Sequence, residues 1–390
     1  MAFFGNGAVN RVNIHSGFVS FAEAMGGAFV LAFLLRAGVS VPQALLAWAA
    51  IHVARFVLRP VILPLGRRFG LKPVLIAGTL LVAASYPILG LVEGVGWTLV
   101  VYLMVSAMGA LFYWTTYHAY FTALGDDEHR GQQIGAREAL AAVTGIVAPL
   151  AGAWALSGLG GVWSFAIAGV IQALAVVPLV HAPDVAVLDR APGAWRAARM
   201  GLVLFAADGW FAAGFHFVWQ IALFTALGQS YAAYGGAMAL AGLVGAVTGL
   251  LLGRHIDGGG GRRAVVIAYI VAGIVVAMRA ASLDLPVLAV VANALGALVV
   301  ALVVPAQMTA VYNLAKASPC PLRFHIVSEA GWDAGCIGGC LTGAAISAMG
   351  LSLAWGIVAT LPALGLVVLV LMRLYGEDTK RLSEANRNLG

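Results

Sequence analysis

Two acidic residues lie inside long apolar stretches, at places that correspond between the two halves of the sequence. Glu23 occurs in Phe-Ala-Glu-Ala-Met-Gly-Gly, and Asp208 occurs in Phe-Ala-Ala-Asp-Gly-Trp. A carboxylate inside an apolar helix is costly unless it meets a partner or water, so each is a functional candidate. Their chemistry suits binding and release of a proton or cation, and a helix–helix hydrogen bond is the structural alternative. We predict Glu23 and Asp208, with Glu138, as coupling residues.

Three basic residues follow one face of the second apolar stretch. His52, Arg55 and Arg59 are three and four residues apart, which places them on one side of a helix. Arg55 lies deeper in the stretch, and we expect it either to pair with Glu23 or to hold an anionic group of a substrate. Arg59 lies near the end of the stretch and is expected to extend towards the membrane interface.

The segment Phe112-Tyr-Trp-Thr-Thr-Tyr-His-Ala-Tyr-Phe121 places its three tyrosines on one helical face and Trp114 and His118 on the adjacent one. Aromatic rings with polar tips suit a cavity wall that handles flat or amphipathic solutes. An aromatic belt at the membrane interface is the alternative.

A second pair of carboxylates, Glu329 and Asp333, lies one helical turn apart near the end of the chain. The pair could bind a cation or form salt bridges between the two halves of the protein. His325 and Cys336 extend the same face, but one straight helix cannot wrap a metal ion. The predicted substrate cavity comprises His52, Arg55, Tyr113, Tyr117, His118, His216, Trp219, Glu329 and Asp333. If the substrate is a metal, His216, Glu329 and Asp333 are its candidate ligands.

The composition assigns these residues to a membrane protein. The chain is 62% hydrophobic and 10% charged, with a mean hydropathy of +0.96. A soluble domain is less apolar and carries far more charge. The net charge of +6 does not indicate nucleic-acid binding, because the basic residues gather in particular loops. The three cysteines form neither a disulfide framework nor a zinc-binding spacing.

Twelve stretches are long and apolar enough to span a bilayer. They fall at 14–35, 42–64, 73–92, 97–123, 131–157, 161–181, 200–227, 231–253, 264–282, 286–315, 325–349 and 352–374. If the N-terminus is cytoplasmic, the loop Lys and Arg residues face the cytoplasm with two exceptions, Arg36 and Arg279, as the positive-inside rule requires. We therefore predict an all-α membrane protein with both termini in the cytoplasm.

The sequence divides into two similar halves. We predict a six-helix bundle over 1–181, a short cytoplasmic linker over 182–199, a second six-helix bundle over 200–375 and a cytoplasmic tail over 376–390.

Two basic, glycine-broken loops recur half a chain apart. The first follows the second apolar stretch and contains Arg68, Gly70, Lys72 and Leu75; the second contains Gly253, Asp257, Gly260 and Arg262. Both loops resemble the loop signature of the major facilitator superfamily. The resemblance implies the fold of this superfamily, which consists of two six-helix bundles. It also implies a cytoplasmic gate between them. The gate residues are Arg67, Arg68, Gly70, Lys72, Asp257 and Arg262.

Arg67 stands where that signature has an aspartate. In the family, this aspartate is thought to lie against the N-terminal end of the eleventh helix, whose dipole favours a negative charge. The resemblance therefore implies that Arg67 weakens one half of the gate, unless Glu329 or Asp333 neutralises it.

The fifth apolar stretch resembles the antiporter motif of exporters in the same superfamily. The motif positions are occupied by Gly135, Thr144, Ala148, Pro149, Gly152 and Ala153. Small residues permit close helix packing and proline permits a bend, which gives the pattern a physical meaning.

Together these features predict a proton-coupled secondary transporter of the inner membrane that exports a small amphipathic or aromatic compound by alternating access. Transport of a divalent metal or metal chelate is the first alternative, and translocation of a lipid or lysolipid is the second. A membrane enzyme is disfavoured because no nucleophile–base or metal motif is present. We expect a monomer with no cofactor and no nucleic-acid partner.

Overall fold

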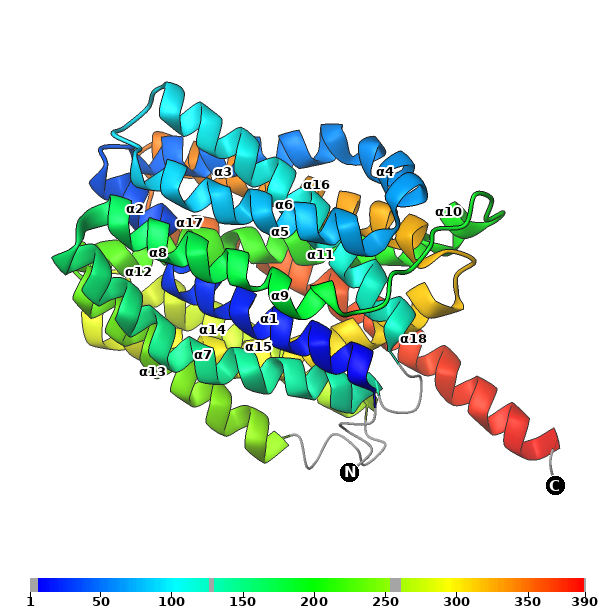
Figure 1. The fold of residues 1–390 in the computed structure, drawn as a ribbon. Coiled ribbons are helices and arrows are strands. Elements are labelled where there is room, and N and C mark those ends of the chain that lie inside the picture. Colours follow the sequence, from blue (N-terminus) through cyan, green and yellow to red (C-terminus); the bar gives the residue numbers. More distant parts are fainter. Residues whose placement is uncertain (1–5, 126–129, 253–260, 389–390) are drawn as a thin grey trace.

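The computed structural model describes residues 6–125, 130–252 and 261–388, and these residues form helices without any strand (Figure 1). The helices lie side by side. The start of α1, the far end of α18 and α10 all lie at the same end of the bundle.

Each predicted apolar stretch corresponds to one helix or to consecutive helical pieces. The first half contains α1 (Gly7–Met25), η2 (Gly27–Phe29), α2 (Val30–Arg36), α3 (Val41–Leu58), η3 (Arg59–Val61), α4 (Ile62–Phe69), α5 (Leu71–Gly90), α6 (Trp97–Leu124), α7 (Arg130–Gly158), α8 (Gly160–Leu174) and α9 (Val176–Val180). The central connection contains α10 (Ala194–Ala197). The second half contains α11 (Arg199–Ala212), the π-helix η4 (Ala213–Val218), α12 (Trp219–Ala226), α13 (Tyr231–Leu252), α14 (Gly261–Ala281), α15 (Pro286–Ala317), α16 (Pro321–Ala348), α17 (Leu353–Val358) and α18 (Leu361–Asn388).

Local sequence explains several of these boundaries. Pro286 and Pro321 begin α15 and α16, and Pro42 lies in the first turn of α3. Proline is favoured there because its missing N–H would have no partner in the helix anyway. Gly70 separates α4 from α5 with a φ of 84°, a conformation that glycine adopts without strain.

Nine helical segments among the described residues are long and apolar enough to cross a membrane. The apolar parts of α7 and α14 are shorter, at Val143–Gly158 and Val265–Ala281. Helix α16 has the required length but carries Arg323, Glu329 and Asp333. This arrangement is consistent with the twelve predicted spans.

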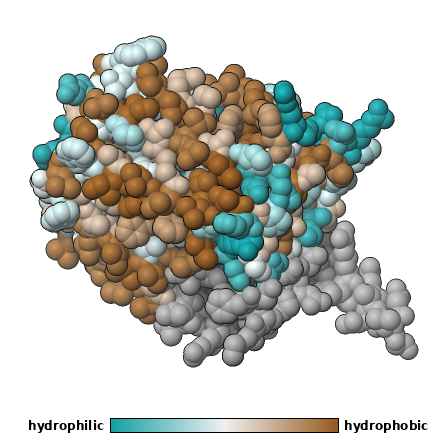
Figure 2. All heavy atoms as spheres, viewed as in Figure 1, coloured by the Kyte–Doolittle hydropathy of each residue, from teal (hydrophilic) through white to brown (hydrophobic). Residues whose placement is uncertain are grey.

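The outer surface is apolar over most of the view in Figure 2, and the most hydrophilic residues gather at the end that carries α10. Large side chains such as Trp97 (79% exposed) and Val287 (80% exposed) project outward. A surface of this kind is expected where the solvent is lipid.

The two halves meet along two symmetric helix pairs. Helix α3 packs against α16, and α7 packs against α13. The antiporter-like stretch lies in the second contact: a Cβ added at Gly242 of α13 would meet the backbone of Gly145, and one added at Gly152 would meet the carbonyl of Met25. The small residues of this stretch therefore allow α7 to approach α1 and α13 closely.

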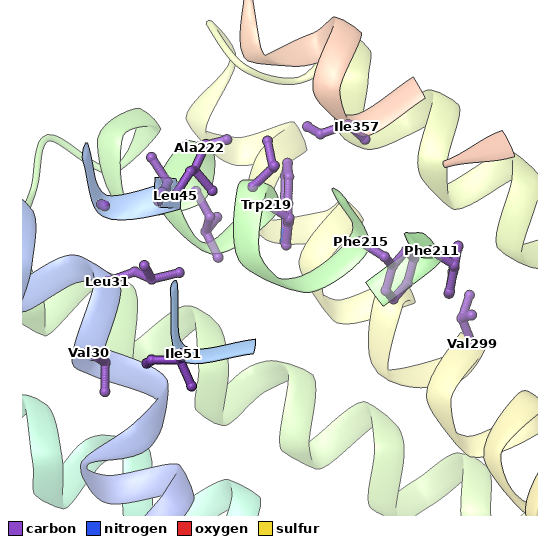
Figure 3. Packing of buried hydrophobic residues seen from close by; sticks show 14 of the residues in the cluster. Val30, Leu31, Leu45, Ile51, Phe211, Phe215, Trp219, Ala222, Val299 and Ile357 are labelled. Atoms are coloured by element: carbon purple, nitrogen blue, oxygen red, sulfur yellow. The ribbon is translucent and has the colours of Figure 1, made fainter. Parts of the chain in front are cut away.

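The π-helix in the seventh span is held by a buried arginine. Arg279 of α14 donates a hydrogen bond to the Phe215 carbonyl. Its guanidinium lies 3.9 Å from the Phe215 ring centroid and 4.8 Å from that of Trp219. Figure 3 shows Phe211, Phe215 and Trp219 within the surrounding apolar packing. A π-helix leaves backbone groups without their usual partners, and Arg279 satisfies one of them.

We expect Gly296→Ala to destabilise this region. A Cβ at position 296 would meet the Arg279 guanidinium, so the arginine would have to leave its place beside Phe215. Overpacking of this kind typically costs about 1–3 kcal/mol. Gly273→Ala is the matched control, because a Cβ there meets nothing within 4 Å. Thermal unfolding of the purified variants measures the difference; equal stability would show that Arg279 is not held tightly at this position.

Candidate functional site

A cluster of four buried charges joins the two halves of the protein. Arg55 of α3 and Arg59, which begins η3, face Glu329 and Asp333 of α16. Arg55 Nη2 lies 3.1 Å from Glu329 Oε2, and Arg55 Nε lies 3.1 Å from Asp333 Oδ1. Arg59 Nη2 forms an ion pair with Asp333 Oδ2. None of the four is more than 5% exposed.

A histidine and a threonine complete the surroundings of these charges. His52 Nδ1 lies 2.9 Å from Asp333 Oδ1, and Arg59 Nη1 donates to Thr115 Oγ1 at 3.0 Å. Two guanidinium groups thus balance two carboxylates inside an apolar bundle. Removal of one member of such a set leaves a buried charge without compensation, which is strongly destabilising.

The cluster corrects two predictions. Arg55 pairs with the carboxylates of α16, whereas the sequence analysis allowed a pair with Glu23. Arg59 is 3% exposed and does not extend towards the interface. The salt bridges predicted for Glu329 and Asp333 between the halves are present. Their basic partners are Arg55 of α3 and Arg59 of η3.

A second polar group adjoins Glu329. His118 Nε2 of α6 lies 3.5 Å from Glu329 Oε1, and His118 Nδ1 lies 2.7 Å from the Tyr312 hydroxyl of α15. That hydroxyl also accepts a hydrogen bond from Arg137 Nη1 of α7 at 3.3 Å. The rings of His118 and His325 are stacked with centroids 5.5 Å apart. Four helices therefore meet at this group.

The tyrosines of α6 form a buried wall rather than an interfacial belt. The rings of Tyr113 and Tyr117 are stacked with centroids 5.5 Å apart, and His15 of α1 lies 5.7 Å from Tyr113. The hydroxyl of Tyr120 donates to the Pro183 carbonyl. All three tyrosines are buried within the protein, so their rings do not face lipid as those of an aromatic belt do.

The predicted coupling carboxylates are not members of the charge cluster, although Asp208 lies close enough to Glu329 to interact with it electrostatically. Glu23 and Asp208 are each partly exposed, and neither forms an ion pair with a described residue. Glu23 is close enough to Tyr86 and Tyr113 to interact electrostatically, and Asp208 reaches the side chain of Gln307. The side chain of Glu138 lies outside the described residues.

His216 and Trp219 belong to a different region. His216 lies in η4 with its ring 5.2 Å from that of Phe215, and Trp219 Nε1 donates to Asn293 Oδ1 at 3.0 Å. In the described ranges, no group of three or more His, Cys, Asp or Glu residues is arranged to hold a metal ion. The three candidate metal ligands, His216, Glu329 and Asp333, are therefore not assembled into a site.

Arg67 has a partner that the sequence analysis did not predict. Its Nη2 and Nε lie 2.6 and 2.8 Å from Asp189 Oδ1, in the central connection. The backbone carbonyl of Asp189 accepts a hydrogen bond from Arg323 of α16 at 2.8 Å. Arg67 is thus neutralised by Asp189, and neither Glu329 nor Asp333 is needed there. Both residues of the ion pair are exposed, so it contributes at most about 1 kcal/mol.

The rest of the first gate loop also contacts the central connection. The backbone N–H of Lys72 donates to Asp184 Oδ1 at 3.0 Å, and Lys72 Nζ donates to the Ala182 carbonyl at 2.9 Å. Arg68 lies over the ring of Phe69 at 5.1 Å. Asp257 and the side chain of Arg262 lie outside the described residues, so the second gate loop stays a prediction.

Sequence reasoning missed Tyr312 and Asp189, and it misjudged Arg59. Tyr312 is a single tyrosine near the end of a long apolar helix, a pattern typical of an interfacial anchor. Asp189 is an ordinary linker carboxylate. The partners of Tyr312 and Asp189 lie on distant segments of the chain, so no sequence pattern indicates them. For Arg59, the spacing of four residues from Arg55 was the one signal that both arginines share a role.

Comparison with known proteins agrees with this fold. The sequence model of the Major Facilitator Superfamily matches residues 15–318. No curated protein matches the sequence. Among solved structures, the chain is similar to the human organic anion transporter MFSD10 (TETRAN), with a TM-score of 0.68 and 16% sequence identity over 94% of this chain and 99% of that one.

Proposed function

This chain belongs to the major facilitator superfamily, and from that premise we propose that it is a proton-coupled exporter of a small amphipathic or aromatic compound. The family makes the protein a transporter of small molecules and not an enzyme. The observation that carries the proposal is the buried charge cluster between α3 and α16. Alternating access separates the halves at one membrane face at a time, so charges buried between them must exchange partners or meet water.

Proton coupling is assigned to Glu23, assisted by Asp208. The two carboxylates occupy counterpart spans of the halves, and each is partly exposed and without an ionic partner among the described residues. A carboxylate held by an arginine stays ionised, whereas one without such a partner can take up and release a proton.

We assign the substrate an aromatic or apolar body and an acidic group. Tyr113 and Tyr117 supply flat surfaces, and an anionic group would replace Glu329 on Arg55. The name of the similar solved structure describes an organic anion transporter, which agrees with this choice although the two sequences share only 16% identity.

The sequence supports the orientation and direction that we propose. The distribution of Lys and Arg favours a topology with both termini in the cytoplasm, and we propose the inner membrane as the location. The antiporter-like stretch of α7 favours export. Metal transport loses support because the candidate ligands do not cluster within the described residues.

Thermal unfolding of the purified protein in the presence of candidate substrates tests the proposal. We expect organic acids with an aromatic or apolar body to raise the melting temperature, because a ligand that binds only the folded state stabilises it. Neutral aromatic compounds, divalent metals and lysolipids form the other arms. Stabilisation by metals or lysolipids alone would replace the proposal with the corresponding alternative.

A transport assay completes the test. Liposomes that contain the protein and an internal pH-sensitive dye should show proton movement when a stabilising compound is added to one side. Substrate uptake without proton movement would refute proton coupling and leave the transporter assignment intact.

A further inference from the structure

We infer that a basic patch beside the start of the seventh span binds the headgroups of anionic phospholipids. The patch consists of Trp195 and Arg196 in α10 and of Arg199 at the first position of α11. The inference requires only that the chain lies in a membrane, and it does not depend on the substrate or the coupling proposed above.

Local structure places the three side chains on one face. Only Ala198 separates α10 from α11, and its backbone stays in the right-handed helical region, with φ of −80° and ψ of −6°. Its N–H donates to a carbonyl of α10 at 3.3 Å, and its carbonyl accepts from an N–H of α11 at 2.9 Å. Arg199 follows Trp195 by four residues and Arg196 by three, and these are the spacings of neighbours on a helix surface.

The opposite face of α10 fixes this orientation. Ala194 and Ala198 are fully buried, and α10 packs against α16 and α11. Trp195 is 48% exposed, and Arg196 and Arg199 are both exposed. The small alanines thus let α10 lie against the bundle, while the bulky aromatic and basic side chains remain on its surface.

The patch continues into the lipid-facing side of a membrane span. Leu202 is 37% exposed and Val203 is 42% exposed, and they follow Arg199 by three and four residues. The segment Arg199–Ala226 is long and apolar enough to cross a membrane. Val203 lies only about 10 Å along the helix from Arg196, from a rise of about 1.5 Å per residue. The two arginines therefore lie at a border between polar and apolar surface, of the kind that Figure 2 shows at the end carrying α10.

The positive charge of the patch is not compensated by the described part of the chain. Neither arginine takes part in an ion pair with a described residue. The two carboxylates of the central connection are engaged elsewhere, since Asp189 pairs with Arg67 and Asp184 accepts a hydrogen bond from the backbone of Lys72. Both guanidinium groups of the patch are therefore available to an anion from outside the protein.

The chemistry of the patch favours a phospholipid over a free anion. Guanidinium groups bind phosphate oxygens through paired N–H donors. A half-exposed indole suits the headgroup layer, where its ring meets apolar chains and its N–H meets polar groups. Basic residues beside a span are attracted to a leaflet with net negative charge. A phospholipid with a negative headgroup satisfies all three features, whereas free phosphate satisfies only the first.

Lipid binding at α10 also stabilises the contact between the two halves. The same central connection contains Asp189, which contacts Arg67 of the first half and Arg323 of the second. Headgroups that hold α10 at the membrane surface limit the movement of this segment. Because such lipids bind the folded state, they raise its stability.

Thermal unfolding of the purified protein in neutral detergent tests the inference. Phosphatidylglycerol is titrated into the protein, and phosphatidylcholine with the same acyl chains is titrated in parallel. We expect the melting temperature of the parent to rise at lower concentrations of phosphatidylglycerol. In Arg196→Gln/Arg199→Gln, the phosphatidylglycerol concentration for half of the effect should increase about 25-fold, because each basic residue near an anionic surface contributes about 1 kcal/mol, or about fivefold. The response to phosphatidylcholine should not change.

The matched control is Arg11→Gln/Arg68→Gln, which removes the same charge from exposed arginines of α1 and α4, outside the patch. This variant should keep the preference of the parent for phosphatidylglycerol. Without added lipid, Arg196→Gln/Arg199→Gln should melt at the temperature of the parent, because both substitutions lie on the surface, and this shows that its fold is intact.

Three results would each overturn the inference. A parent that does not distinguish the two lipids would show that the patch does not recognise a negative headgroup. An equal loss in the control variant would show that total charge, and not the patch, sets the response. An equal rise with inorganic phosphate alone would show that the anion need not be a lipid. None of these results bears on the proposed function, which the transport assay tests separately.

Discussion

Asp333→Asn is expected to abolish transport and to lower the stability of the protein by about 3–5 kcal/mol, the usual effect of removing one partner from a buried ion pair. The carboxylate lies between Arg55, Arg59 and His52, and it is fully buried. Asparagine keeps the size of the side chain but leaves two guanidinium groups facing only Glu329. The uncompensated charge forces the α3–α16 contact apart.

Thermal unfolding of the purified variant and uptake into liposomes measure the two effects. Asp284→Asn is the matched control, because Asp284 is an exposed residue of the turn between α14 and α15. A second substitution sharpens the test: adding Arg59→Gln to Asp333→Asn restores charge balance and should recover part of the lost stability. Strictly additive losses in the double variant would mean that the two residues do not interact.

Glu23→Gln is expected to remove the response of transport to an imposed pH gradient. Glutamine has nearly the same shape as glutamic acid but cannot release a proton at any physiological pH. If Glu23 carries the coupling proton, net transport driven by the gradient falls to the level of empty liposomes. Exchange of substrate at equal pH continues, because it requires only movement of the loaded protein. Asp208→Asn should weaken the gradient response less, in line with its assisting role.

Glu93→Gln provides the control, since Glu93 is an exposed carboxylate in the turn between α5 and α6. Gradient-driven uptake that survives Glu23→Gln unchanged would place the proton site elsewhere.

The ion pair of Arg67 with Asp189 changes how the gate is understood. Family resemblance alone implied a like-charge contact at the start of α16 and a weakened gate. The central connection instead supplies a carboxylate, and the same residue binds Arg323 through its backbone. A short linker that joins the halves thereby also contacts both of them at one end of the bundle.

The sequence by itself determined the class of fold and the order of the spans. Apolar length decides which segments can lie in a bilayer, because each unsatisfied backbone group there is costly. Helical spacing then decides which side chains share a face, so the grouping of His52, Arg55 and Arg59, and that of Glu329 and Asp333, followed from residue numbers alone. Gly70 and the helix-starting prolines fixed local boundaries through their backbone preferences.

Only the tertiary structure decided which faces meet. Helical periodicity tells which residues lie on one side of a helix, but it carries no information about the neighbouring helix. From the sequence, the possible partners of Arg55 were Glu23 and an anionic group of a substrate. In the structure, α3 packs against α16, and Arg55 therefore pairs with Glu329 and Asp333. Burial of Arg59 and the contact of His118 with Tyr312 arise in the same way, because their partners come from segments far apart in the chain and are fixed by the close packing of the two halves.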